Sequence, residues 1–123
     1  MVADNMTVED VMTTELITIA PTASVRAAAR AMMDAAVKAV IVTAVEPGIL
    51  TSTDLIEVVA EGLSPTSTSV EAVMTPRVEV VTPSIPVTEA AAMMETFGIS
   101  HLPVYSDDII GMISATDVTA SMG

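Results

Sequence analysis

The chain has 123 residues, of which 51% are hydrophobic, and its sixteen acids against four bases give a formal net charge of −12. This composition is that of a globular chain, long enough for one domain or for two half-domains that share a core. The negative charge repels phosphate backbones and anionic lipid surfaces, which argues against nucleic acid and membranes as partners. The absence of cysteine excludes disulfides, zinc–thiolate sites and thiol catalysis.

The composition and the N-terminus also bear on where the protein works. The excess of acids over a single lysine is typical of proteins from a high-salt cytoplasm, and equally of an ordinary solvated acidic surface, so both interpretations stay open. The first five residues lack the basic and then apolar order of a signal peptide. No run approaches the roughly 18 consecutive apolar residues that span a bilayer. We expect a soluble, cytoplasmic protein.

An internal repeat is the strongest feature of the sequence. The segment 8–13 returns 62 positions later as 70–75, and the segment 48–54 returns 63 positions later as 111–117. The extra residue falls in the turn before the glycine, where loops tolerate insertions. The pattern predicts a first repeat at 1–62, a linker rich in Ser, Thr and Pro at 63–69, and a second repeat at 70–123.

Both repeats show the same order of predicted elements. The first repeat is expected to contain strands at 16–19, 37–45 and 49–50 and helices at 25–36 and 52–61. The second is expected to contain strands at 78–81, 99–105 and 109–113 and helices at 87–96 and from residue 116 onward. Each repeat is therefore β-α-β-β-α. Because a unit of roughly 55 residues buries too little apolar surface alone, we expect an α+β fold in which the two repeats pack about a pseudo-two-fold axis.

The last strand of each repeat runs into its last helix through a corner of the form hydroxyl-x-x-Asp. One interpretation is a capping box, in which Thr51 or Ser114 caps the helix and Asp54 or Asp117 reaches back to the amide of the cap. The other interpretation is a ligand site, because a helix N-terminus attracts anions and a carboxylate beside it can accept bonds from a sugar diol. The sequence leaves both open.

Three segments of the second repeat, at 73–76, 98–104 and 111–117, together resemble a tandem cystathionine β-synthase (CBS) domain pair, and the first repeat resembles its first half more loosely. The resemblance covers nearly the whole chain. It implies a regulatory module that binds adenosine-containing ligands such as AMP, ATP, NAD, S-adenosylmethionine or methylthioadenosine in clefts between the two repeats. The closing aspartate of each corner would hold the ribose hydroxyls.

The resemblance also assigns residues to two clefts. In one of them Asp54 would meet a group from the second repeat, namely Val80, Ile99, Ser100, His101 and Pro103. In the other cleft Asp117, in a corner with Ser114 and Thr116, would meet Thr18, Val37, Lys38 and Ala39 from the first repeat. Backbone groups of these segments would read the adenine edge while apolar side chains cover its faces.

The first repeat departs from the family pattern. Its segment 35–41 lacks both the glycine and the proline that the second repeat has at 98 and 103, which predicts a differently shaped second strand. The position before each aspartate, often basic in the family, is Thr53 or Thr116. The remaining cations that could meet a phosphate are Arg26, Arg30, Lys38, Arg77 and His101.

No arrangement of residues points to catalysis. His101 is the only histidine, and no carboxylate is paired with a nucleophile or a base, so we expect neither an enzyme nor a metal site nor a permanent cofactor. Helical stripes rich in Ala and Met predict a homodimer, and a sensor requires an effector protein, which the sequence does not identify. The alternative is a dimeric structural or interaction module in which the clefts bind nothing and the corners serve only as caps.

Overall fold

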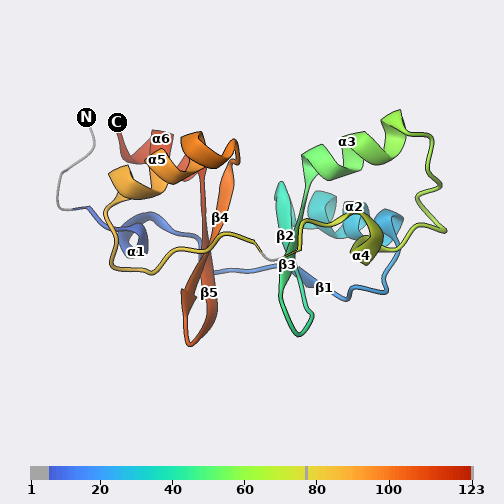
Figure 1. Ribbon diagram of the computed structural model, residues 1–123, viewed down its shortest axis with the longest axis horizontal. Helices are drawn as coiled ribbons and strands as arrows, with labels where there is room; N and C mark the ends of the chain where they lie inside the picture. Colours follow the sequence, from blue (N-terminus) through green and yellow to red (C-terminus); the bar gives the residue numbers. More distant parts are fainter. Residues whose placement is uncertain (1–5, 77, 123) are drawn as a thin grey trace. The chain divides into compact units, whose positions relative to one another are not determined.

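The computed structural model describes residues 6–76 and 78–122, so the N-terminal five residues and the candidate cation Arg77 lie outside the described residues. The chain forms two compact units (Figure 1). The central unit is Ile17–Val78, and the terminal unit combines Met1–Leu16 with Glu79–Gly123. The terminal unit is thus built from the two ends of the chain.

The central unit is a three-stranded sheet with helices packed on it. Its strands lie in the order β1, β2, β3, with β1 parallel and β3 antiparallel to β2. The strands are β1 (Thr18–Ile19), β2 (Ala39–Val42) and β3 (Gly48–Thr51), and the helices are α2 (Val25–Ala35), α3 (Ser52–Ala60) and α4 (Val70–Val73). The core is aliphatic and forms where α2 and α4 meet β2 and β3.

The terminal unit repeats this plan with an antiparallel pair of strands. Its elements are α1 (Val8–Val11), α5 (Val87–Phe97), β4 (His101–Ser106), β5 (Asp108–Ser114) and α6 (Ala115–Ser121). The predicted α+β class and the order of the longer elements are confirmed. The four-residue helices α1 and α4 were not predicted, because a single turn shows no helical periodicity.

The prediction of a strand at 78–81 is wrong. In this region only Val81 pairs, through a parallel bridge to Val104. In the central unit the amide of Ile41 donates to the carbonyl of Ile17 at 3.0 Å, which ties down the start of β1. The second repeat has Pro103 at the position of Ile41, and proline has no amide hydrogen to donate. The strand is therefore reduced to a bridge.

Each repeat contributes its opening helix to the unit that contains the other repeat. The amide of Val8 in α1 donates to the carbonyl of Ile85 at 2.9 Å, and Val8 is fully buried in the core of the terminal unit. In the same way, the amide of Val70 in α4 donates to Ala23 at 2.8 Å, and Val70 is fully buried in the core of the central unit. The compact units are therefore not the sequence repeats.

A second contact holds each exchanged segment in place. After α1 the backbones of Thr13 and Met112 exchange two hydrogen bonds of 2.9 Å, next to Gly111. A Cβ atom added to Gly111 would lie 2.7 Å from Sδ of Met12 and 3.0 Å from the carbonyl oxygen of Thr13. A Cβ atom added to Gly48 would lie 2.7 Å from Sδ of Met74 and 3.0 Å from the carbonyl oxygen of Thr75. The glycine that opens each repeated motif is needed because another backbone lies against it.

This close approach predicts that Gly111→Ala destabilises the protein. The carbonyl of Thr13 cannot move without breaking its own pairing, so the added methyl should lower the free energy of unfolding by about 1–3 kcal/mol. Urea unfolding followed by circular dichroism measures the loss. Gly62→Ala is the control, because its added Cβ meets nothing within 4 Å and only the left-handed backbone, with φ of 70°, opposes it. A smaller loss for Gly111→Ala than for Gly62→Ala would contradict the packing explanation.

Candidate functional site

The corner between β5 and α6 is a capping box. The amide of Ser114 donates to Oδ2 of Asp117 at 2.8 Å, and the amide of Asp117 donates to Oγ of Ser114 at 3.1 Å. Both bonds satisfy amides that the first turn of a helix leaves without an intrahelical partner. The capping interpretation of this corner is therefore correct.

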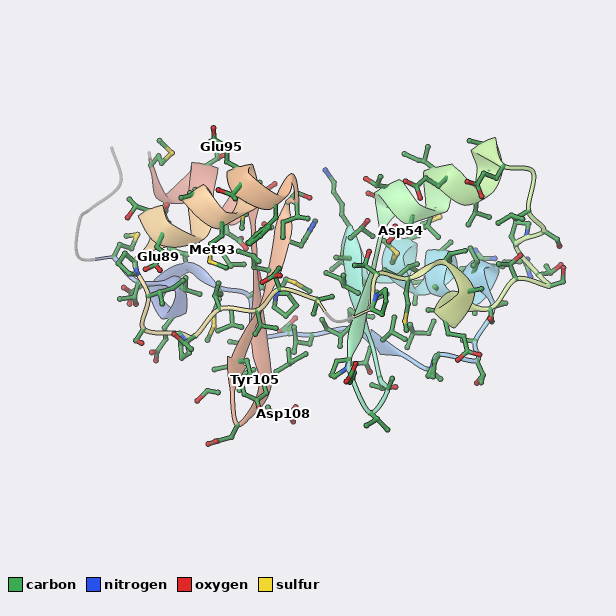
Figure 2. The ribbon with its side chains drawn as sticks, viewed as in Figure 1. Asp54, Glu89, Met93, Glu95, Tyr105 and Asp108 are labelled. Atoms are coloured by element: carbon green, nitrogen blue, oxygen red, sulfur yellow. The ribbon has the colours of Figure 1, made fainter. Side chains whose placement is uncertain are left out.

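The corner between β3 and α3 is built in the same way. Figure 2 shows Asp54 at the strand end of α3. Its Oδ2 accepts a bond of 2.8 Å from the amide of Thr51 and one of 3.3 Å from the hydroxyl of Thr51. Among the described residues no hydrogen bond reaches Oδ1 of Asp54 or of Asp117. One carboxylate oxygen can thus hold the cap while the other accepts a bond from a ligand.

A third capping box, which sequence reasoning missed, begins α1. The amide and the hydroxyl of Thr7 donate to Oδ2 of Asp10 at 2.8 and 3.1 Å. The spacing of hydroxyl and aspartate in the sequence could have revealed it. This box does not follow a long strand, and it shows that the pattern can serve as a cap without any predicted ligand site.

Each corner lies beside the start of the strand that precedes its own. This strand is β2 for the corner between β3 and α3, and β4 for the corner between β5 and α6. In the central unit the amide of Ser52 donates to the carbonyl of Lys38 at 3.0 Å, and Ala39 pairs with Thr51. The predicted residues Lys38 and Ala39 therefore lie next to the Asp54 corner. Lys38 is exposed, so its ammonium group is open to solvent beside this corner.

The terminal unit shows the matching arrangement. The amide of Ala115 donates to the carbonyl of Ser100 at 2.8 Å, and His101 pairs with Ser114. The hydroxyl of Ser100 lies 3.0 Å from Nδ1 of His101, within hydrogen-bonding distance. The structure thus brings Ser100 and His101 to the corner that contains Ser114 and Asp117.

The other predicted site residues differ in exposure. Thr18 and Thr116 are exposed, Val37 is half-buried, and Val80 and Ile99 are 41% and 37% exposed. Pro103 is fully buried in β4, so its side chain is not open to solvent. The pairing of Asp54 with the group from the second repeat, and of Asp117 with the group from the first, stays a prediction.

The turn that joins α2 to β2 has the same backbone shape as the turn that joins α5 to β4, although only the second of them contains a glycine. Ala36 adopts φ 55° and ψ 43° after α2, and Gly98 adopts φ 65° and ψ 35° after α5. The following amides, those of Val37 and Ile99, each donate to a helix carbonyl at 3.0 Å. These bonds can hold an alanine in the left-handed region at a cost of about 1 kcal/mol.

This strain predicts that Ala36→Gly stabilises the protein. Removing the Cβ from a left-handed position should raise the free energy of unfolding by about 0.5–1 kcal/mol, and Gly98→Ala should lower it by a similar amount. Chemical denaturation of the two variants measures both changes. Ala35→Gly, one position earlier and inside α2, should instead destabilise by about 1 kcal/mol. Destabilisation by Ala36→Gly would show that the alanine is not strained.

The described residues also limit which other sites are present. Within residues 6–76 and 78–122, no group of three or more His, Asp or Glu side chains is placed to hold a metal ion. No helix in the described part of the chain is long and apolar enough to cross a membrane. Thr53 and Thr116, at the second position of α3 and α6, are both exposed and uncharged. The corners therefore offer carboxylate and backbone groups, with little positive charge.

Comparison with known proteins shows the family to which the two repeats belong. The CBS domain model matches residues 8–61 and again residues 70–122. The chain is 32% identical over 117 residues to the L-aspartate semialdehyde sulfurtransferase of Methanosarcina acetivorans, covering 91% of this chain and 23% of that protein. A CBS domain-containing protein of Arabidopsis thaliana is matched over 20% of its length. The chain thus spans less than a quarter of these curated relatives.

Two solved structures share the fold over nearly the whole chain. A hexameric CBS-CP12 protein from bloom-forming cyanobacteria matches with a TM-score of 0.89 and 28% identity, covering 97% of this chain and 67% of that one. The CBS domain pair of the protein MJ0100, solved in complex with 5′-methylthioadenosine and S-adenosyl-L-methionine, matches with a TM-score of 0.87 and 24% identity. That match covers 96% of this chain and 100% of the other, and it shows the fold.

Proposed function

The chain belongs to the CBS domain family, and from this premise we propose that it is a non-catalytic regulatory module of the cytoplasm that binds adenosine-containing ligands at its two corners. The observation that carries the proposal is the duplicated carboxylate. In both corners Oδ2 of the aspartate is held by the cap, while Oδ1 accepts no bond from the described residues. An oriented carboxylate with a free acceptor suits a ribose diol.

The surroundings of each corner support a nucleoside. The backbone at Lys38 and Ala39 in one unit, and at Ser100 and His101 in the other, lies directly beside the aspartate corner. Exposed apolar side chains, Val80 and Ile99, are available in the terminal unit to cover a base. The pair of the same fold that was solved with methylthioadenosine and S-adenosylmethionine makes these two compounds the first probes.

Sensing requires that the ligand bind two states of the module unequally. A ligand that binds both states with the same affinity shifts nothing, so the adenosyl compound must favour one conformation. The favoured conformation would present a changed surface to an effector protein. We propose further that the module is a homodimer, since Met33, Ile56 and Val59 leave apolar side chains 67–77% exposed on its helices.

A second function has its own support. The Thr7–Asp10 box caps α1 with the same geometry, although no ligand site is predicted there. If the other two corners are also only caps, the protein is a dimeric interaction module without a ligand. The two functions predict different results when the aspartates are replaced: a sensing module loses ligand affinity, whereas an interaction module has no ligand affinity to lose.

Replacing Asp54 or Asp117 by asparagine separates capping from binding. The amide oxygen of asparagine can still accept the bond from the N-cap residue, but its nitrogen cannot accept one from a ribose hydroxyl. We expect each variant to remain folded and to bind methylthioadenosine more weakly by about 1.5–3 kcal/mol at its own site. Isothermal titration calorimetry with methylthioadenosine and S-adenosylmethionine measures the loss.

Asp10→Asn is the matched control, because it alters the same kind of capping box away from the predicted sites. It should leave the binding isotherm unchanged. Binding of methylthioadenosine or S-adenosylmethionine that is unaffected by Asp54→Asn and Asp117→Asn would exclude the corners as the site. Failure of the wild type to bind any of AMP, ATP, NAD or the two first probes would favour the interaction module.

The charge of the ligand should decide its affinity. A triphosphate brings several negative charges to a protein at −12, and Thr53 and Thr116 can donate hydrogen bonds but cannot neutralise charge. We expect AMP, methylthioadenosine or S-adenosylmethionine to bind more tightly than ATP, with the difference shrinking as salt is added. Titrations of AMP and ATP at low and high sodium chloride test this. A tenfold preference for ATP at low salt would show that a cation cluster or a metal ion assists it.

A further inference from the structure

Two methionines occupy equivalent places in the two compact units. Met12 directly follows α1 and Met74 directly follows α4, and the amide of each donates to the carbonyl of the first residue of its helix at 2.9 Å. Both side chains are half-buried, and each packs against the core of its own unit. Each exchanged segment therefore carries one thioether at the end of its helix, partly open to solvent.

The sulfur atom of each methionine lies against a glycine. A Cβ atom added to Gly111 would lie 2.7 Å from Sδ of Met12, and one added to Gly48 would lie 2.7 Å from Sδ of Met74. No side chain fits at so short a distance, so the sulfur occupies the space that the glycine leaves open. Any atom added to the sulfur on this side must displace the strand or the segment.

The residue after each methionine holds the exchanged segment on its strand. The backbones of Thr13 and Met112 exchange two bonds of 2.9 Å, and those of Thr75 and Ile49 exchange bonds of 2.9 and 3.0 Å. The helices α1 and α4 have four residues each, and a single turn is not stable by itself. A change at either sulfur therefore acts directly beside the hydrogen bonds that hold the segment.

We propose that Met12 and Met74 are oxidation sites through which a peroxide loosens the two exchanged segments. A peroxide such as hydrogen peroxide is uncharged, so the net charge of −12 does not repel it. A lone pair of the sulfur attacks one peroxide oxygen, the O–O bond breaks, and the proton on the transferred oxygen passes to the departing hydroxide. The products are a sulfoxide and water; the sulfur loses two electrons and the peroxide gains them. Methionine sulfoxide reductases, supplied with a thiol reductant, reverse the step.

A sulfoxide does not suit the place where the thioether packs. Its oxygen is a polar acceptor, which either turns toward the glycine, where even a Cβ atom has no room, or draws the sulfur away from the core. Both glycines are already paired within their own hairpins, Gly111 with Val104 and Gly48 with Val42. Either orientation of the oxygen therefore weakens the pairing next to it.

The candidate sites lie on the same strands as the two glycines. Gly111 belongs to β5, which ends at the Asp117 corner, and Gly48 belongs to β3, which ends at the Asp54 corner. Oxidation should therefore also weaken binding of methylthioadenosine, and this one consequence rests on the proposed function. If the reduced wild type binds no adenosyl probe, the proposed function fails by itself, because release of the segments is measured without a ligand.

The order in which the methionines react provides the first test. Met122 is 50% exposed, whereas Met32 and Met94 are only 4% and 7% exposed. The folded wild type is treated with dilute hydrogen peroxide, and peptide mass spectrometry follows each sulfoxide with time. Met12 and Met74 should react more slowly than Met122 and about tenfold faster than Met32 and Met94, because local opening is easier than global unfolding. Reaction as slow as that of Met32 and Met94 would overturn the proposal.

Hydrogen exchange measures the release of the segments. In the oxidised wild type the amides of Thr13 and Thr75 should exchange about tenfold faster than in the reduced protein. The amides of Ile41 and Tyr105, which donate to carbonyls of other segments at 3.0 and 2.8 Å, are the references and should keep their rates. Treatment with the reductases for both sulfoxide epimers should restore the slow exchange. Unchanged exchange at Thr13 and Thr75 after complete oxidation of the preceding methionines would contradict the inference.

Paired substitutions identify which sulfurs are responsible. Met12→Leu with Met74→Leu removes both proposed sites at nearly constant volume, whereas Met33→Leu with Met122→Leu removes two exposed thioethers instead. Peroxide should no longer accelerate exchange in the first variant and should accelerate it fully in the second. If the first variant folds poorly, reversal by the reductases in the wild type makes the same comparison. Acceleration that persists in the first variant, or is lost in the second, would show that other methionines carry the effect.

Discussion

Backbone pairing of Thr13 with Met112, and of Thr75 with Ile49, is the contact on which the arrangement of this protein depends. Each pair joins a segment that follows an opening helix to a strand of the other sequence repeat, and each needs a glycine, at 111 or 48, so that the two backbones can approach. Once these pairs form, Val8 and Val70 are carried into cores made mostly by the other repeat. Neither core can be completed from one repeat alone. The strands fixed in this way end in the two aspartate corners, so the position of the candidate sites follows from the exchange.

The corners show how one short motif can cap a helix and still leave one carboxylate oxygen open. The carboxylates of Asp54 and Asp117 each turn one oxygen toward the amide of the N-cap residue. This bond fixes the orientation of the side chain before any ligand arrives, which reduces the entropy that binding would otherwise cost. Under the proposed function the cap would therefore preorganise the binding residue and would not be an alternative to it. The same local bonds occur at Asp10, so the candidate sites are set apart from it by the strand that lies beside each of their corners.

Much of the fold and part of the site could be predicted from the sequence. The capping boxes at Asp54 and Asp117 could be predicted because their bonds connect residues three positions apart, although the same signal at Asp10 was missed. The long helices could be predicted because α2 and α5 repeat their apolar residues with helical spacing. The exchange of α1 and α4 could not be predicted, because a repeated Val-Met-Thr segment does not indicate which copy of the glycine it meets. The strand at 78–81 was wrong because one proline on its neighbour removes the donor that would extend it. The left-handed backbone at Ala36 could not be predicted, because local hydrogen bonds at the end of α2 outweigh the preference of a single residue.

The exchange of opening helices also has a consequence for how such a chain can arise. A protein with a single repeat would have an opening helix that its own core does not accommodate and a core that lacks a helix, and a second molecule would supply both. Two such molecules would form a swapped dimer, held together only as long as their concentration exceeded the dissociation constant. Joining two copies in one chain makes the exchange intramolecular, which replaces the concentration of free molecules by an effective concentration within the chain. The tandem chain is, in these terms, a swapped dimer that dilution cannot dissociate.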